Sequence, residues 1–267
     1  GTDNVEDDML SLILGSLHLP FHSDVRMFGS VLVEDERHHL IEQLHLRIDK
    51  RIPVPYLIHQ AWFCGLPFYV DERVLIPRSP IAELIEQRFS PWVEADEVDN
   101  ILDLCTGSGC IAIALANAFA NASVTGVDIC DQALAVATRN RQQHQLESRV
   151  NLVQSDLWAA IPAQRFDLIV SNPPYVGQQE LAALPAEYEH EPEKALFAED
   201  DGLAIVSEIL SHAKHFLTEK GILVVEVGNS QDLLQARYPN VPFVWLEFER
   251  GGQGVFLLTA EQLSTYF

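Results

Sequence analysis

Four consecutive residues in the second half of the chain, Asn172 to Tyr175, have the types and order needed to hold a planar amine: Asn-Pro-Pro-Tyr. They follow the apolar run 166–170, and two consecutive prolines cannot continue a central strand, so the chain must leave the sheet there. We expect the Asn172 side-chain oxygen and the Pro173 carbonyl to accept hydrogen bonds from an NH₂ group, with Tyr175 stacked on its face. Such acceptors turn the delocalised lone pair toward an incoming methyl group and stabilise the charge that develops on nitrogen.

This tetrapeptide therefore predicts methyl transfer to an amide or aryl amine without a metal ion. The residues predicted to be catalytic are Asn172, Pro173, Pro174 and Tyr175. The alternative interpretation is a rigid turn where a strand leaves the sheet.

A glycine-containing loop ends an earlier apolar run, from Asp103 to Gly109, and leads directly into a helical segment. Glycine lets the backbone turn tightly and approach a ligand, and the N-terminus of the helix offers free N–H groups to an anion. By itself the pattern also fits an ordinary tight turn between a strand and a helix. It does not indicate a dinucleotide-binding loop, because Ala112 stands where the third glycine is expected.

Two further acids follow the next two apolar runs. Asp128 comes about twenty residues after the glycine loop, where a carboxylate accepts both hydroxyls of a ribose. We expect Asp156 to accept a hydrogen bond from an adenine amine, with Leu157 against the ring. Acids at three successive strand ends are typical of an S-adenosylmethionine (SAM) site, although Asp128 and Asp156 also suit simple caps of helices or turns. The residues predicted to bind the cofactor are Asp103, Thr106, Gly107, Ser108, Gly109, Asp128, Ile129, Asp156, Leu157 and Asn172.

These residues require a sheet whose strands end at one edge. Apolar runs at 98–104, 123–127, 150–153, 166–170 and 222–227 alternate with helical segments at 110–120, 131–144 and 202–217. Two later runs, 241–248 and 254–258, predict a closing hairpin. Repeated strand–helix units with nearly all-apolar strands predict an α/β fold, with a parallel sheet covered by helices on both faces and the ligand beyond the carboxyl ends of the strands. We expect Asp131 to cap the 131–144 helix.

The first part of the chain has a different pattern. Helical periodicity interrupted by prolines predicts a small helical domain over residues 1–62. From residue 63 to 77, two apolar runs flank a polar stretch from Asp71 to Arg73, which predicts a β-hairpin linker that turns there. A helix over 80–89, with Pro80 in its first turn, follows. We therefore divide the chain into residues 1–62, a linker over 63–79 and a third region over 80–267.

Charge and composition argue against several classes of protein. With 39 acidic and 17 basic side chains among 267 residues, the net charge of −22 argues against a broad nucleic-acid surface, which needs clustered Lys and Arg, and favours a basic partner or none. We expect no transmembrane helix and no signal peptide. The four cysteines lack zinc-finger spacing, so we expect neither structural zinc nor disulfides, and a cytoplasmic protein.

From about residue 63 to the C-terminus, these motifs resemble the protein glutamine methyltransferases of the HemK/Prm family. The resemblance implies a class I SAM-dependent methyltransferase: a Rossmann-like, mostly parallel seven-stranded sheet with a C-terminal antiparallel hairpin, plus a helical substrate-recognition domain and a hairpin linker. It implies methyl transfer from SAM to the side-chain amide nitrogen of a glutamine held at Asn172 to Tyr175. It also implies that the SAM loop is Asp103 to Gly109, that Asp128 is the ribose acid and that Asp156 contacts adenine.

The linker distinguishes branches of that family. The release-factor branch follows Ile-Pro-Arg with Pro-Asp-Thr-Glu, whereas here Ile76-Pro77-Arg78 is followed by Ser-Pro-Ile-Ala. This stretch and residues 68–73 resemble the branch that acts on a glutamine of the third large-subunit ribosomal protein. Ribosomal proteins are strongly basic, which suits a partner of charge −22.

Other interpretations stay open from the sequence. A glutamine of a release factor or an exocyclic base amine in DNA or RNA would fit the same acceptors, although the nucleic-acid substrates need a basic surface. A non-catalytic SAM-binding factor for ribosome assembly is a third alternative. The triplet ending at Gln253 matches the release-factor substrate motif but is expected to be a hairpin turn, with self-methylation as the lesser alternative. Glu226 has no assigned role, and we expect the acidic segment 176–200 to be a loop over the site, either facing a basic substrate or simply solvated.

Overall fold

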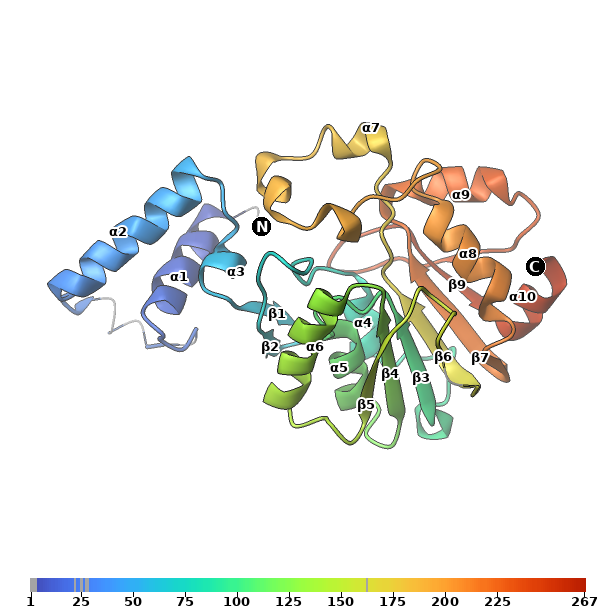
Figure 1. The fold of residues 1–267 in the computed structure, drawn as a ribbon. Helices are drawn as coiled ribbons and strands as arrows, with labels where there is room; N and C mark the ends of the chain where they lie inside the picture. The colour runs from blue at the N-terminus through green and yellow to red at the C-terminus, as the bar shows by residue number, and fades with distance from the viewer. Residues whose placement is uncertain (1–3, 22, 25, 27–28, 162) are drawn as a thin grey trace.

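The computed structural model describes residues 4–21, 23–24, 26, 29–161 and 163–267. Its centre is a seven-stranded sheet in the order β5-β4-β3-β6-β7-β9-β8 (Figure 1). Five strands are parallel: β3 (Asn100–Leu104), β4 (Ser123–Asp128), β5 (Val150–Gln154), β6 (Phe166–Ser171) and β7 (Leu217–Glu226). Antiparallel β9 (Val255–Thr259) and β8 (Val244–Trp245) complete it. The predicted fold class and closing hairpin are confirmed.

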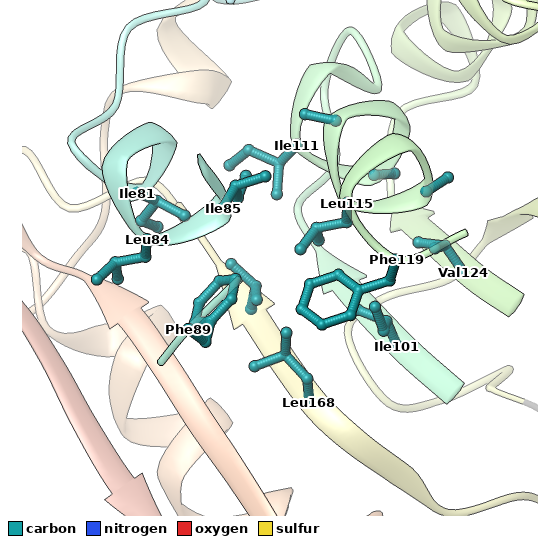
Figure 2. Packing of buried hydrophobic residues seen from close by; sticks show 14 of the residues in the cluster. Ile81, Leu84, Ile85, Phe89, Ile101, Ile111, Leu115, Phe119, Val124 and Leu168 are labelled. Atoms are coloured by element: carbon teal, nitrogen blue, oxygen red, sulfur yellow. The ribbon is translucent and has the colours of Figure 1, made fainter. Parts of the chain in front are cut away.

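Helices cover both faces of the sheet. Because successive strand residues point to opposite faces, Ile101 packs in one core and Leu102 and Leu104 in the other. The first core contains α4 (Ile81–Glu86) and α5 (Cys110–Ala118), shown in Figure 2. The second contains α8 (Ala204–Ala213), α9 (Gln231–Arg237) and α10 (Ala260–Tyr266). Sequence reasoning predicted neither α9 nor α10, and its 202–217 helix ran past the end of α8 to Leu217, the first residue of β7.

Helix α6 (Asp131–Gln143) covers the edge of the sheet near β4 and β5. Its buried Ala133 and Val136 pack against Val70 and Val74 of the linker. The predicted cap at Asp131 is wrong, because Asp131 is already the first helical residue and Cys130 holds the cap position without a side-chain bond.

The N-terminal region is helical, as predicted. It contains α1 (Val5–Ser16), α2 (Glu34–Asp49) and the single turn α3 (Val54–Leu57), and α1 and α2 lie to one side of the sheet in Figure 1. Buried Leu12, Leu14 and Leu40 supply part of the apolar side of this region. The division of the chain at residues 62 and 79 stays a prediction.

The linker contains a hairpin, but its turn is not where the sequence predicted it. Strands β1 (Ala61–Phe63) and β2 (Leu66–Phe68) pair around Cys64 and Gly65, whose φ values of 48° and 71° suit a two-residue hairpin turn. The stretch from Asp71 to Arg73 is a turn without paired strands. Of the apolar residues that follow, Val74 and Ile76 are buried although they belong to no strand, and Val74, Leu75 and Pro77 line the wall of a cavity.

Candidate functional site

A large cavity opens beyond the carboxyl ends of the central strands, where the strand order reverses between β3 and β6. Its volume is about 820 Å³. The structure brings together in its wall most of the residues predicted to bind a cofactor: Thr106, Gly107, Ser108, Asp128, Ile129, Asp156, Leu157 and Asn172.

The other two predicted cofactor residues, Asp103 and Gly109, lie outside that wall. Asp103 is fully buried, and its Oδ2 accepts hydrogen bonds from Thr106 Oγ1 at 2.5 Å and from the Ala112 N–H at 3.0 Å. Burial raises the pKa of the Asp103 carboxyl to about 7, although these two hydrogen bonds lower it. Gly109 precedes α5 with φ at 78°, and a Cβ there would lie 3.1 Å from Ala137. Both residues hold the shape of the glycine loop.

Asp128 connects the glycine loop to the end of β4. Its Oδ2 accepts a hydrogen bond from the Gly107 N–H at 2.8 Å, and its Oδ1 accepts one from the Cys130 N–H at 2.9 Å. Burial raises the pKa of Asp128, while the hydrogen bonds from Cys130 and Gly107 act in the opposite direction. A carboxylate has about four acceptor positions in all, so these hydrogen bonds leave Asp128 with acceptor capacity for a ligand.

The predicted catalytic residues stand where the large cavity meets a second one of about 220 Å³. Asn172 lines both cavities, while Pro173 and Tyr175 line the smaller one and Pro174 the larger. Ser171, the last residue of β6, fixes this exit by donating a hydrogen bond to the Leu104 carbonyl at 2.8 Å. Within the described part of the chain, neither Asn172 Oδ1 nor the Pro173 carbonyl accepts a hydrogen bond.

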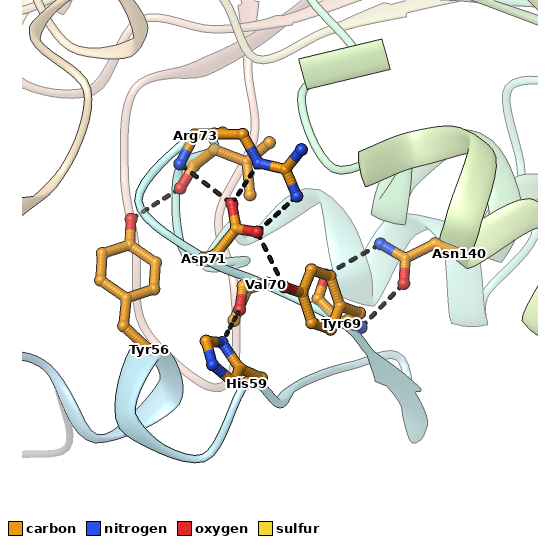
Figure 3. Close-up of polar contacts among 8 residues, drawn as sticks. Tyr56, His59, Tyr69, Val70, Asp71, Arg73 and Asn140 are labelled. Atoms are coloured by element: carbon orange, nitrogen blue, oxygen red, sulfur yellow. Dashed lines mark hydrogen bonds and ion pairs between the residues drawn. The ribbon is translucent and has the colours of Figure 1, made fainter. Parts of the chain in front are cut away.

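The linker supplies part of the larger cavity's wall that sequence reasoning missed. Figure 3 shows how it is held: Tyr69 Oη donates to Asp71 Oδ2 at 2.9 Å, and Arg73 forms an ion pair with the same oxygen at 2.5 Å. Tyr56 Oη donates to the Val74 carbonyl at 2.6 Å. The linker residues in the wall are Glu72, Arg73, Val74, Leu75, Pro77, Arg78 and Ser79.

Asn140 attaches this linker to the glycine loop. Its fully buried side chain accepts from the Tyr69 N–H at 2.7 Å and donates to the Tyr69 carbonyl at 3.0 Å and to the Ser108 carbonyl at 2.9 Å. The sequence did contain a signal for this residue: its spacing places Asn140 on the same buried face of α6 as Ala133 and Val136. A buried amide on an apolar stripe needs partners.

The segment 176–200 forms part of the walls of both cavities. It contains α7 (Gln178–Leu181) and the short 3₁₀ turns Ala186–His190 and Glu193–Ala195, and it lies between the N-terminal helices and α9 in Figure 1. Three of its acids are paired within the chain: Glu187 with Arg47 at 3.1 Å, buried Glu191 with Arg78 at 2.6 Å, and Asp200 with Arg237. The Arg78 guanidinium also lies 4.7 Å from the Tyr188 ring centroid. The segment is therefore packed rather than a simply solvated loop.

Other possible chemistry finds little support in the described ranges. They contain no group of three or more His, Cys, Asp or Glu side chains placed to hold a metal ion, and no helix there is long and apolar enough to cross a membrane. The four cysteines are free thiols, and burial raises the pKa of Cys110, in the cavity wall, to about 12. This thiol is therefore a poor nucleophile.

Solved structures share this fold. One is the hMettl16 catalytic domain bound to a MAT2A 3′UTR hairpin, with a TM-score of 0.59 and 18% identity over 89% of this chain and 87% of that one. Another is the Thermus thermophilus 16S rRNA N2 G1207 methyltransferase with AdoMet and guanosine, with a TM-score of 0.52 and 17% identity over 75% and 49%. At these identities the likeness concerns the fold alone, which is that of class I SAM methyltransferases.

Sequence relatives are much closer. Residues 88–187 match the family described as "Methyltransferase small domain". Two relatives carry the name ribosomal protein uL3 glutamine methyltransferase. The one from Francisella tularensis is 49% identical over 100% of this chain and 85% of its own length, and the one from Neisseria gonorrhoeae is 47% identical over 98% and 88%. The chain therefore belongs to the family of ribosomal protein uL3 glutamine methyltransferases.

Proposed function

We propose that this chain transfers a methyl group from SAM to the side-chain amide nitrogen of a glutamine in ribosomal protein uL3, in the cytoplasm. One observation carries the chemistry. Asn172 Oδ1 and the Pro173 carbonyl lack donors in the described residues and stand where the two cavities meet. A glutamine amide has two N–H donors in one plane, which is the complement of these two acceptors.

The larger cavity suits SAM. Asp128 keeps acceptor capacity for the ribose hydroxyls, and Asp156 offers a carboxylate to the adenine amine. Exposed Ile129 and half-buried Leu157 supply apolar surface for the ring. Arg73, Arg78 and Lys194 in the wall are cations of the kind that the methionyl carboxylate needs. We infer that these residues hold the cofactor.

The protein's own groups then have an orienting role. Bound SAM supplies an electrophilic methyl group: as the amide nitrogen takes it, S-adenosylhomocysteine leaves with the electrons of the S–C bond, and the methylated nitrogen gives one proton to water. Asn172 Oδ1 and the Pro173 carbonyl accept hydrogen bonds from the two amide hydrogens and so turn the nitrogen lone pair toward the larger cavity. The same two oxygens stabilise the positive charge that develops on the nitrogen. Holding the amide in one orientation removes much of the entropic barrier, and no side chain of the enzyme has to act as a nucleophile.

The proposed substrate also suits the overall charge. A net charge of −22 attracts a basic protein and repels nucleic acid, so a free ribosomal protein fits better than a base amine in RNA. The likeness to RNA methyltransferases does not alter this, because it concerns the fold alone. The relatives' name favours uL3 over a release factor.

The decisive experiment offers methyl-labelled SAM and the enzyme three substrates separately: purified uL3, a release factor, and ribosomal RNA. We expect label on one glutamine of uL3, located by peptide mass spectrometry. If label appeared only on the release factor, or on RNA, that molecule would be the substrate instead of uL3. The enzyme incubated without a substrate measures any methylation of Gln253.

A further inference from the structure

Tyr175 is enclosed by contacts from outside its own tetrapeptide. Its hydroxyl donates to Glu226 Oε1 at 2.9 Å, and its carbonyl accepts from Ser230 Oγ at 3.0 Å. Gly228 has φ at 49°, and a Cβ there would lie 2.6 Å from Tyr175 Cε2. A side chain at position 228 would therefore displace the ring. The tyrosine is fixed at its hydroxyl, its carbonyl and its ring.

Glu226 is an unusual partner for such a site. It is the last residue of β7, only 5% of it is exposed, and among the described residues no Lys, Arg or His forms an ion pair with it. Its two oxygens accept from two hydroxyls instead: Tyr175 Oη, and Ser79 Oγ at 2.5 Å. A buried carboxylate is costly unless it is well hydrogen-bonded. The hydrogen bonds from Tyr175 and Ser79 offset this cost, and both of these residues line the candidate site.

The two hydroxyls belong to different cavities. Ser79 lies in the wall of the larger cavity, and Tyr175 lies in the wall of the smaller one. Glu226 lines neither cavity, so it reaches both only through these side chains. The two hydrogen bonds therefore attach both hydroxyls to one buried side chain.

The position of the Tyr175 ring matters for the reaction. The ring lines the smaller cavity, which we take as the glutamine pocket because the two amide acceptors stand where it meets the larger cavity. Positive charge develops on the glutamine nitrogen there during methyl transfer. An aromatic face near a cation stabilises it, and small displacements of a positioning group reduce the rate strongly. A ring that moves freely would weaken both effects.

We propose that Glu226 is a positioning residue: its buried carboxylate fixes Tyr175 in the glutamine pocket and, through Ser79, ties that pocket to the cofactor cavity. The inference rests on the proposed function. The inference goes beyond the proposed function because it assigns a role to a residue that contacts neither substrate nor cofactor.

A double-mutant cycle tests the contact without reference to activity. The free energy of unfolding is measured for the wild type, Tyr175→Phe, Glu226→Ala and the double variant. We expect strongly non-additive losses, because either single change removes the same hydrogen bond. Additive losses would overturn the inference, and they would do so even if uL3 proved not to be the substrate.

The same four proteins are then assayed for methyl transfer to uL3. We expect Tyr175→Phe and Glu226→Ala each to lower kcat by about 10- to 100-fold, the range for leaving one buried hydrogen-bonding group unpaired, with no further loss in the double variant. The affinity for S-adenosylhomocysteine, measured by calorimetry, should change little. No transfer by the wild type would refute the proposed function and leave the unfolding cycle as the test of the contact.

Glu226→Gln separates positioning from charge. A glutamine can accept from Tyr175 through Oε1 and donate to Ser79 Oγ, so we expect kcat close to that of the wild type. Activity as low as that of Glu226→Ala would mean that the charge itself is needed and would overturn a positioning role. Glu83→Gln is the matched control, because Glu83 is also buried but accepts from the Glu249 and Arg250 N–H groups away from Tyr175. It should lower stability without lowering kcat.

Discussion

Asp128 both shapes the cavity and offers acceptors to a ligand, and these roles can be separated by mutation. Asp128→Ala removes the acceptors for the ribose hydroxyls as well as those for Gly107 and Cys130. We expect SAM binding to weaken by about 2–3 kcal/mol, measured by calorimetry, which is the cost of leaving hydrogen bonds to a charged group unmade.

Asp128→Asn is the companion variant. It keeps the size of the side chain and one acceptor oxygen, so it should lose less affinity than Asp128→Ala. SAM affinity unchanged in both variants would remove Asp128 from the cofactor site.

Asn172 is the residue whose substitution tests the amide-orienting mechanism most directly. Asn172→Ala deletes one of the two acceptors and should reduce turnover by roughly 100-fold, as deleting one donor of an oxyanion hole does. SAM binding should change much less, because the ribose and adenine contacts remain. Near-normal turnover on uL3 would show that the amide is not held in this way.

Asp103 should make stability depend on pH. Its pKa is raised to about 7 by burial in the folded chain, against about 3.9 when unfolded. Between these values only the folded chain holds the proton, so its contribution to stability is complete below about pH 4 and is lost as the pH rises through about 7.

Asp103→Asn cannot lose a proton, so it isolates this effect. Without cofactor, the melting temperature of the wild type relative to Asp103→Asn should fall between pH 4 and pH 8. The other titrating groups are common to both proteins and cancel in the comparison. A difference in melting temperature that stays the same at every pH would mean that burial does not raise the pKa of Asp103 above its value in the unfolded chain.

At the scale of elements, the central strands could be predicted and the linker could not. Runs such as Leu168–Val170 are apolar because both faces of a parallel strand are buried, and this pattern is independent of distant contacts. The run that contains Val74 and Ile76 is just as apolar, but it is buried because it packs against α6, which is remote in sequence. Periodicity cannot distinguish these two kinds of burial.

The candidate site divides in the same way. Residues at strand ends, such as Asp128 and Asn172, could be placed because parallel strands end at one edge of a sheet. Arg78 and Ser79 could not, because the linker is held at the cavity by contacts between residues far apart in sequence, such as the hydrogen bond between Asn140 and Tyr69. Glu226 was found in sequence but gained a role only when Tyr175 and Ser79 were seen beside it.

The segment 176–200 gives an element-scale prediction. Glu191→Gln breaks the ion pair with Arg78, whose side chain is 33% exposed. It also weakens the hydrogen bond that Glu191 accepts from the Ile76 N–H at 3.2 Å. We expect the free energy of unfolding to fall by about 2–3 kcal/mol in denaturant titrations. Activity should fall too, because Arg78 lines both cavities.

Glu189→Gln is the matched control for this prediction. Glu189 lies two residues away in the same segment but is exposed, so its substitution should change stability by no more than about 0.5 kcal/mol. Equal losses in the two variants would mean that the segment is not held by the Glu191–Arg78 pair.

For the whole molecule, the question is which acids attract a basic substrate. Glu187 and Glu191 are already paired with arginines, so neutralising them would disturb the fold rather than report on docking. Glu189, Glu193 and Glu199 are exposed in the same segment and face solvent. These three are the acids of segment 176–200 that we expect to meet uL3.

Charge steering predicts a salt dependence that these three acids should control. The Debye length falls from about 30 Å at 0.01 M to about 8 Å at 0.15 M ionic strength, so kcat/KM for uL3 should fall with added salt while SAM affinity moves little. Replacing Glu189, Glu193 and Glu199 by glutamine should flatten this dependence. The matched control neutralises Glu94, Asp96 and Glu97, which are exposed just before β3 and therefore at the opposite edge of the sheet. Both variants remove three negative charges, so equal salt profiles would show that uL3 responds to the net charge alone and does not dock on segment 176–200.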